Sequence, residues 1–119
     1  MNKEFIPYNL ALELKELGFD EPCIAFYEPG NKEVQVVGVE QRYNDPELLR
    51  LKDFCAPLYQ QAFRFFREKY FLGHGINPYS LDTHLIDLED CIFYDIDDVY
   101  TYEEAELACL KKLIEIAKK

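Results

Sequence analysis

The chain has 119 residues, of which 49% are hydrophobic and 30% are charged, and its formal net charge is −10. This composition is typical of a folded globular protein and excludes a disordered chain. The length predicts one compact domain over residues 1–119 without a linker.

Positive and negative residues are distributed unevenly along the chain. Residues 1–69 contain nine Lys and Arg against twelve acids, whereas residues 70–110 contain ten acids and no Lys or Arg. Residues 111–119 add four Lys and one Glu. A surface built from the middle segment repels nucleic-acid phosphates and attracts basic partners. The sequence therefore predicts no direct nucleic-acid binding.

The hydropathy of the chain predicts neither a membrane span nor export. No run approaches the roughly 18 apolar residues that a membrane helix needs. The N-terminal stretch MNKEFIPYNL lacks the apolar segment of a signal peptide. We therefore expect a cytoplasmic protein with no membrane contact. Its cysteines lack zinc-ligand spacing, and we expect them to be unpaired, buried thiols: Cys23, Cys55, Cys91 and Cys109.

The first part of the chain predicts a helix and a β-hairpin. Leucines recur at helical spacing from about Pro7 to Leu17, and Gly18 suits the left-handed end of that helix. The segment from Cys23 to Val39 has two strand-like runs separated by Pro29-Gly30, which is typical of a type II turn. Residues 40–53 are polar; they predict a turn at 44–46 and a short helix at 47–52.

The stretch QQAFRFFREKYFLG, residues 60–73, interleaves aromatic residues with Arg and Lys. Aromatic and basic side chains together form nucleic-acid-binding surfaces. On a helical wheel, however, the two sets point in different directions. We therefore expect a helix from about Ala56 to Phe71 with its aromatic face in the core and Arg64 and Arg67 in solvent.

After this helix, Gly73 and Gly75 predict a loop from His74 to Tyr79. Strands are expected near residues 81–86 and 91–96, with a turn at 88–90 between them.

The C-terminal segment predicts a helix that begins after Thr101. Thr101 and Glu104 have the spacing of a capping box, and acids precede lysines along the segment, as the helix dipole favours. The expected core stripe consists of Leu107, Leu110, Ile114 and Ala117, widened by Leu113 and Ile116. The element order is therefore α-β-β-α-β-β-α. We expect an α+β fold with three helices and two β-hairpins, the helices packed on a mostly antiparallel sheet; whether the two hairpins form one sheet stays open.

Two dense acidic clusters, DLED at 87–90 and YDIDD at 94–98, invite a metal interpretation. Carboxylates suit Mg²⁺ or Ca²⁺, and Asp95 and Asp97 would share one face of a strand, which makes them the only metal candidates. The plainer interpretation, which we favour, is an acidic rim that discourages edge-to-edge aggregation.

Catalytic chemistry has little support in the sequence. A pairing of His84 with Cys91 across the hairpin would lack both a third member and an oxyanion hole. The sequence predicts no catalytic residue and no cofactor.

Three phrases carry a resemblance: IPYNLALELKELGFDEPC, APLYQQAFRFFREKY and TYEEAELACLKKLIEIAKK. They resemble a group of short uncharacterised proteins carried on bacterial prophages and other mobile elements. The likeness covers both ends of the chain and the central helix. It implies a small bacterial or phage protein, and it implies no activity, cofactor or site residue.

These observations favour a non-catalytic accessory protein that acts by binding another protein. The expected interaction residues are Asp87, Glu89, Asp90, Asp95, Asp97 and Asp98, with Arg64 and Arg67 as a second contact. Two alternatives stay open. One is an acidic decoy that occupies a nucleic-acid-binding protein. The other is a small metal-dependent enzyme that uses the acids of residues 87–98. The identity of the partner and self-association also stay open.

Overall fold

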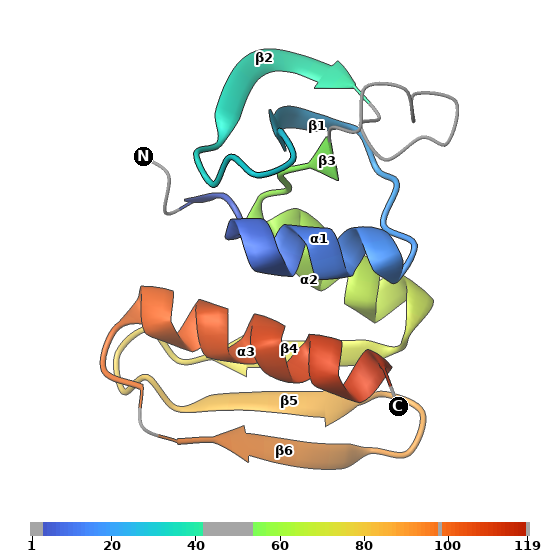
Figure 1. Ribbon diagram of the computed structural model, residues 1–119. Helices are drawn as coiled ribbons and strands as arrows, with labels where there is room; N and C mark the ends of the chain where they lie inside the picture. Colours follow the sequence, from blue (N-terminus) through green and yellow to red (C-terminus); the bar gives the residue numbers. More distant parts are fainter. Residues whose placement is uncertain (1–3, 42–53, 98, 119) are drawn as a thin grey trace. The chain divides into compact units, whose positions relative to one another are not determined.

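The computed structural model describes residues 4–41, 54–97 and 99–118 (Figure 1). The chain divides into two compact units, Met1–Tyr59 and Gln60–Lys119. The described residues form three helices and two three-stranded antiparallel sheets, which confirms the predicted α+β class. The two hairpins belong to separate sheets. A single domain over the whole chain stays a prediction.

The first unit contains one helix and the sheet β2-β1-β3, in which both neighbours of β1 run antiparallel to it. Its elements are α1 (Tyr8–Glu16), β1 (Cys23–Tyr27), β2 (Gln35–Gln41) and β3 (Phe54–Cys55). The helix α1 packs against β3. It ends as the sequence predicts: Gly18 is left-handed with φ of 97°, and the Phe19 N–H donates to the Leu14 carbonyl at 3.0 Å.

Aromatic rings fill the core of the first unit. The ring of Tyr8 meets those of Tyr27 and Phe54 edge-on, with centroids 5.4 and 5.1 Å away. The buried Tyr27 hydroxyl donates to the Ile6 carbonyl at 2.6 Å, so its polar end is satisfied. The hairpin between β1 and β2 is the predicted one, with Gly30 in the left-handed region at φ of 81°.

The prediction of four unpaired, buried thiols is wrong for three of the cysteines. Cys23 of β1 and Cys55 of β3 are joined as a disulfide, because the antiparallel pairing of these strands brings together two positions 32 residues apart. Cys91 is unpaired but exposed, whereas Cys109 is unpaired and buried as predicted. Burial, and then Glu106, raises the pKa of Cys109 to about 12, so this thiol is unreactive.

The second unit contains two helices and the sheet β4-β5-β6, again antiparallel throughout. Its elements are α2 (Tyr59–Lys69), β4 (Leu72–Ile76), β5 (Thr83–Asp87), β6 (Ile92–Ile96) and α3 (Tyr102–Ala117). The helix α3 packs across all three strands (Figure 1). The central strand differs between the units, β1 in one and β5 in the other. The two units therefore do not repeat one topology.

The predicted loop from His74 to Tyr79 is wrong at its start, because residues 72–76 form strand β4. The glycines are needed there for space. A Cβ at Gly75 would lie 2.5 Å from Cε1 of His84 on the neighbouring strand, and a Cβ at Gly73 would lie 3.1 Å from Cγ2 of Ile86. Glycine inside a strand thus marks the close approach of a side chain rather than the end of an element.

The helices of the second unit follow the predicted patterns closely. In α2, the aromatic face is buried and Arg64 and Arg67 are exposed, as predicted. In α3, the Thr101 hydroxyl accepts from the Glu104 N–H at 3.1 Å, which confirms the cap. The core stripe of α3 is wrong in detail. Its buried residues are Ala105, Cys109, Leu110, Leu113 and Ile114.

Three predictions lie outside the described residues: the turn at 44–46, the helix at 47–52 and the position of Asp98. Among the residues that the structure does describe, no helix combines the length and the apolar character needed to cross a membrane.

Candidate functional site

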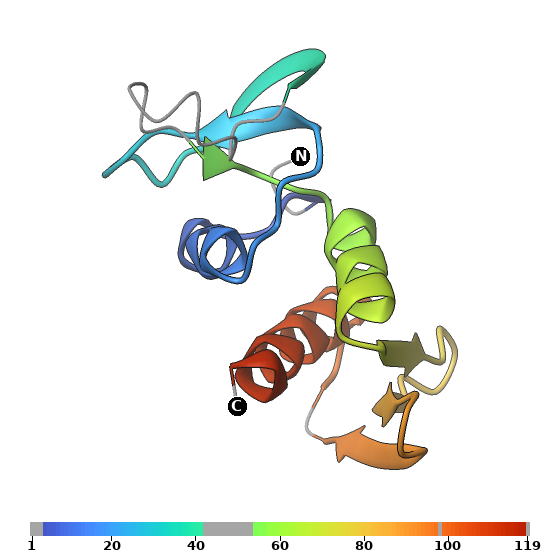
Figure 2. The same cartoon turned by 90° about the vertical axis from the view of Figure 1, so that its right-hand side faces the viewer.

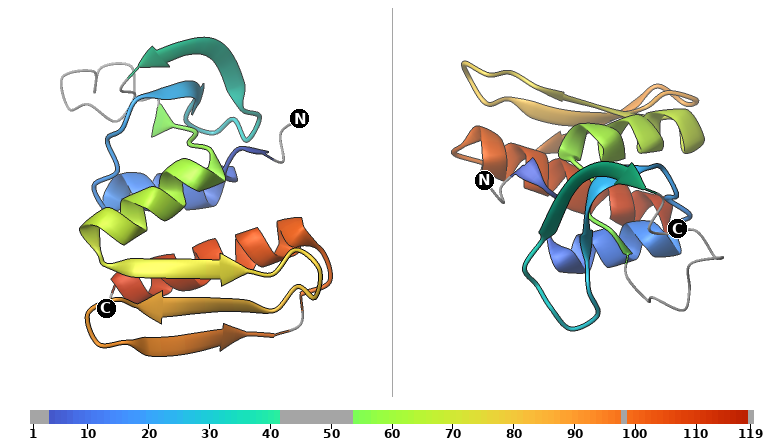
Figure 3. Two further views of the ribbon diagram at one scale, coloured as in Figure 1. Left: turned by 180° about the vertical axis from the view of Figure 1, so that it is seen from behind. Right: turned by 90° about the horizontal axis from the view of Figure 1, so that it is seen from above.

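The sheet β4-β5-β6 has one face covered by helices and one face left open. Side chains alternate between the faces, and directly paired residues share a face. Leu85 is fully buried beneath α3, and it pairs with His74 of β4 and Tyr94 of β6. The His74 ring stacks on Phe63 of α2 at 3.8 Å, so α2 lies on this same inner face. Figures 2 and 3 show both helices of this unit on one side of its sheet.

The opposite face, here called the outer face, consists of His84 and Ile86 of β5 and Phe93 and Asp95 of β6, beside the two glycines of β4. Phe93 pairs with Ile86 and remains 63% exposed, although it lies within a strand. Its ring centroid is 5.9 Å from that of His84. An exposed aromatic ring on the face of an edge strand is costly for a solvated surface and is typical of a surface that binds a partner.

Two more exposed apolar side chains lie at one end of this face. Phe71 is 50% exposed just before β4, and Leu88 is 45% exposed just after β5. The Leu88 N–H donates to the Phe71 carbonyl at 2.8 Å, which holds the two residues together. A Cβ at Gly73 would come within 4 Å of the Leu88 side chain, so this residue adjoins the outer face. The apolar surface therefore continues from Phe93 towards the turn.

Acidic residues border this apolar surface. Glu89 and Asp90 are exposed in the turn between β5 and β6, and Asp95 and Asp97 are exposed at the far end of β6. Asp87 is half-buried and has a structural role, and its predicted role in binding stays a prediction. Its carboxylate accepts from the N–H groups of Glu89 and Asp90 at 3.0 and 3.2 Å, so it stabilises the turn.

The acids do not assemble a metal centre in the part of the chain that the structure describes. Asp95, Asp97, Asp82 and His84 line one pocket at the end of β5 and β6. No group of three His, Cys, Asp or Glu side chains among the described residues has the geometry to hold a metal ion. The pairing of His84 with Cys91 is also wrong, because the register places His84 opposite Asp95 and leaves Cys91 in the turn.

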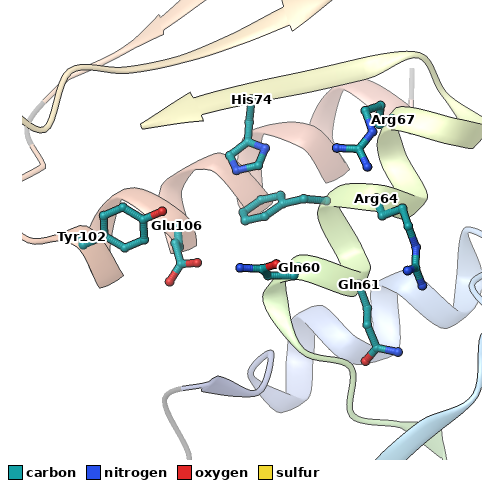
Figure 4. A pocket seen from close by; sticks show the side chains of 8 residues that line it. Gln60, Gln61, Arg64, Arg67, His74, Tyr102 and Glu106 are labelled. Carbon is teal, nitrogen blue, oxygen red and sulfur yellow. The ribbon is translucent and has the colours of Figure 1, made fainter. Parts of the chain in front are cut away.

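Arg64 and Arg67 lie apart from the acidic rim, on α2 and therefore on the inner side of the sheet. They line a pocket of about 410 Å³ between α2, β4 and α3, here called the arginine pocket. Figure 4 shows Arg67 reaching towards His74 from α2, while Tyr102 and Glu106 enter from α3 on the other side. The pocket is completed by Gln60, Gln61 and Phe63 of α2.

The environment of this pocket alters the ionisation of two of its side chains. Burial, and then the charges of Arg67 and His84, lower the pKa of His74, so this imidazole is held neutral at physiological pH. Burial and the nearby Glu103 carboxylate raise the pKa of Glu106. Perturbed groups that face one cavity are typical of binding sites.

The exposed acids are visible in the sequence, but the residues that give each site its shape are not. Nothing in the stretch CIFYDI distinguishes Phe93 from the flanking Ile92 and Tyr94, because the register of β6 decides which of them faces outwards. The sequence predicts a loop at His74 and a helix that includes Tyr102 and Glu106, but no pocket that these three residues share. The spacing of four residues, which places Tyr102 and Glu106 on one side of a helix, is the available signal for these two.

No family model, curated protein or solved structure matches this chain. The resemblance to proteins of prophages and mobile elements stays a prediction.

Proposed function

We propose that this protein acts by binding another protein, and that the contact is made by the outer face and free edge of the strand β6. The single observation that carries the proposal is the exposure of Phe93 on the open face of the edge strand β6, with acids on either side of it along the chain. Apolar anchors surrounded by charged residues are the usual composition of a protein–protein interface.

The charges bordering this surface define the chemistry of the partner. No Lys or Arg occurs between residues 70 and 110, so Glu89, Asp90, Asp95 and Asp97 meet no basic side chain from their own segment. A partner that presents Lys or Arg beside an apolar residue complements them and associates faster at low salt. A second copy of β6 would bring like charges together, so the acids disfavour self-pairing at this edge.

The geometry of β6 favours an extended segment as the part of the partner that binds. Among the described strands, β6 pairs only with β5, so its other edge has no strand partner among them. An extended segment that pairs with such an edge gains backbone hydrogen bonds, while its alternate side chains reach the sheet face. A segment with basic and apolar residues in alternation would place its apolar side chains beside Phe93.

Affinity capture of the tagged protein from cells that naturally produce it, at low and high salt, tests the proposal when two charge variants are compared. One variant carries Glu89→Gln, Asp95→Asn and Asp97→Asn. The control carries Asp20→Asn, Glu28→Gln and Glu33→Gln, three exposed acids of the first unit. Both variants change the net charge equally. We expect the first variant to lose a basic protein that the control retains, with a larger loss at low salt. Equal behaviour of the two variants would contradict the proposal.

The decoy hypothesis is a special case of this proposal, and the same capture tests it. It requires the captured protein to bind nucleic acid and DNA to compete with the chain for it. If DNA does not compete, the decoy hypothesis is wrong and the protein-binding function remains.

A further inference from the structure

The arginine pocket consists of residues that do not belong to the proposed protein-binding surface. Gln60, Arg64 and Arg67 stand four and then three residues apart on α2, so they form one stripe along the helix, and all three line the pocket. Each of these side chains carries N–H donors, and each guanidinium carries five. The Arg67 guanidinium points towards His74, whereas the Arg64 guanidinium extends away from His74, Tyr102 and Glu106 (Figure 4). The helix therefore lines the cavity with three donor-bearing side chains, and Arg67 is the charged one that points inwards.

The opposite walls add further donors and a rigid apolar surface. The Phe63 ring is buried and stacks on the His74 ring with an interplanar angle of 23°, which fixes the orientation of the imidazole. A neutral imidazole still has one N–H donor. Tyr102 contributes a hydroxyl group from α3. Among the described residues, Glu106 is the only carboxylate that lines the pocket.

The geometry points to a second binding site: the arginine pocket takes the carboxylate or phosphate group of a small organic anion. Guanidinium groups bind both kinds of oxyanion in a bidentate manner, and amide, imidazole and phenol donors add further hydrogen bonds. A volume of about 410 Å³ lies within the range of small-ligand sites. Burial, and then Glu103, raises the pKa of Glu106, so binding of an anion beside this carboxyl group becomes easier as the pH falls.

This inference is independent of the proposed function, because the pocket lies on the inner side of the sheet and Phe93 lies on the outer face. Two titrations of the whole chain distinguish a phosphate ligand from a carboxylate ligand. One uses sodium phosphate and the other uses sodium succinate. NaCl keeps the ionic strength constant in both. The readout is the NMR signals of the arginine Nε–H groups and the histidine rings.

We expect at least one of the two anions to shift the signals of Arg67 and His74 in a saturable manner, at millimolar concentration or below. Saturation by phosphate alone assigns a phosphate ligand, and saturation by succinate alone assigns a carboxylate ligand. The variant Arg67→Gln is expected to weaken binding at least tenfold. Lys69→Gln is the matched control: it removes the same charge from the same helix, but Lys69 does not line the pocket and its ammonium lies over the rings of Phe65 and Tyr70.

Two results would overturn the inference. One is the absence of any saturable shift with either anion up to about 10 mM, which corresponds to a binding free energy weaker than about −3 kcal/mol. The other is an equal loss of binding in Arg67→Gln and Lys69→Gln, because this would show attraction by net charge rather than a site. Neither variant changes a buried side chain, so both are expected to fold.

Discussion

Leu85→Ala should lower the unfolding free energy more than Phe93→Ala does, although Phe is the larger side chain. The two residues lie on neighbouring strands of one sheet but on different faces. Leu85 is 0% exposed beneath α3, and Leu-to-Ala changes at such positions cost about 2–5 kcal/mol of unfolding free energy. A buried Phe would cost about 3–5 kcal/mol, because more carbon atoms are removed.

Phe93, however, is 63% exposed, so only about a third of its surface leaves water on folding. At about 25 cal/mol per Å² and about 200 Å² for the side chain, this burial contributes about 1–2 kcal/mol as an upper estimate. Urea unfolding followed by circular dichroism measures both variants. We expect Leu85→Ala to be the more destabilising, by about 1–3 kcal/mol. An equal or larger loss for Phe93→Ala would show that the outer face is covered, and the proposed binding surface would be lost with it.

Three further changes test other parts of the structure. Thr101→Ala removes the acceptor for the Glu104 N–H and should lower the unfolding free energy by about 1 kcal/mol in a urea titration; no change would show that the cap is not formed. Cys91→Gly relieves a left-handed backbone with φ of 57° at an exposed turn and should raise the unfolding free energy by up to about 1 kcal/mol, whereas a loss would contradict this conformation. The pKa of His74 is lowered below its ordinary value of 6.5, so the unfolded chain binds more protons as the pH falls below that value. The unfolding free energy should therefore decrease between pH 7 and pH 5, and His74→Gln should flatten this decrease; an unchanged slope in the variant would refute the assignment.

The parts of the fold that the sequence predicted are those determined by local patterns. The aromatic residues of α2 recur with the helical period and its arginines fall on the other side, so both the helix and its buried face could be identified. The same is true of the Thr101 cap and of the left-handed Gly18, because each motif depends on residues within one turn.

The parts that were missed depend on contacts between distant segments. Strand β4 contains two glycines and resembles a loop locally, and the reason for Gly75 is the His84 ring on the next strand. Strand β3 is two residues long and has no pattern of its own. The disulfide requires the pairing of β1 with β3, which no spacing of Cys23 and Cys55 reveals.

In the candidate site, too, features set by the local sequence could be predicted, and features set by strand register could not. The acids near β6 were identified because the absence of Lys and Arg from residues 70–110 is visible in the sequence. The role of Asp87 in the turn and the outward direction of Phe93 could not be identified, because both follow from the register of β5 and β6.

Site-specific photo-crosslinking tests the binding surface most directly. A photoreactive phenylalanine analogue replaces Phe93 in one variant and Tyr79 in the control; Tyr79 is an aromatic residue of the turn before β5 and is 96% exposed. Both are introduced in cells that naturally produce the protein. We expect a crosslink from position 93 to an extended, basic segment of one protein, lost when Asp95 and Asp97 are changed to Asn, and no such product from position 79. Identical products from both positions, or none from position 93, would contradict it.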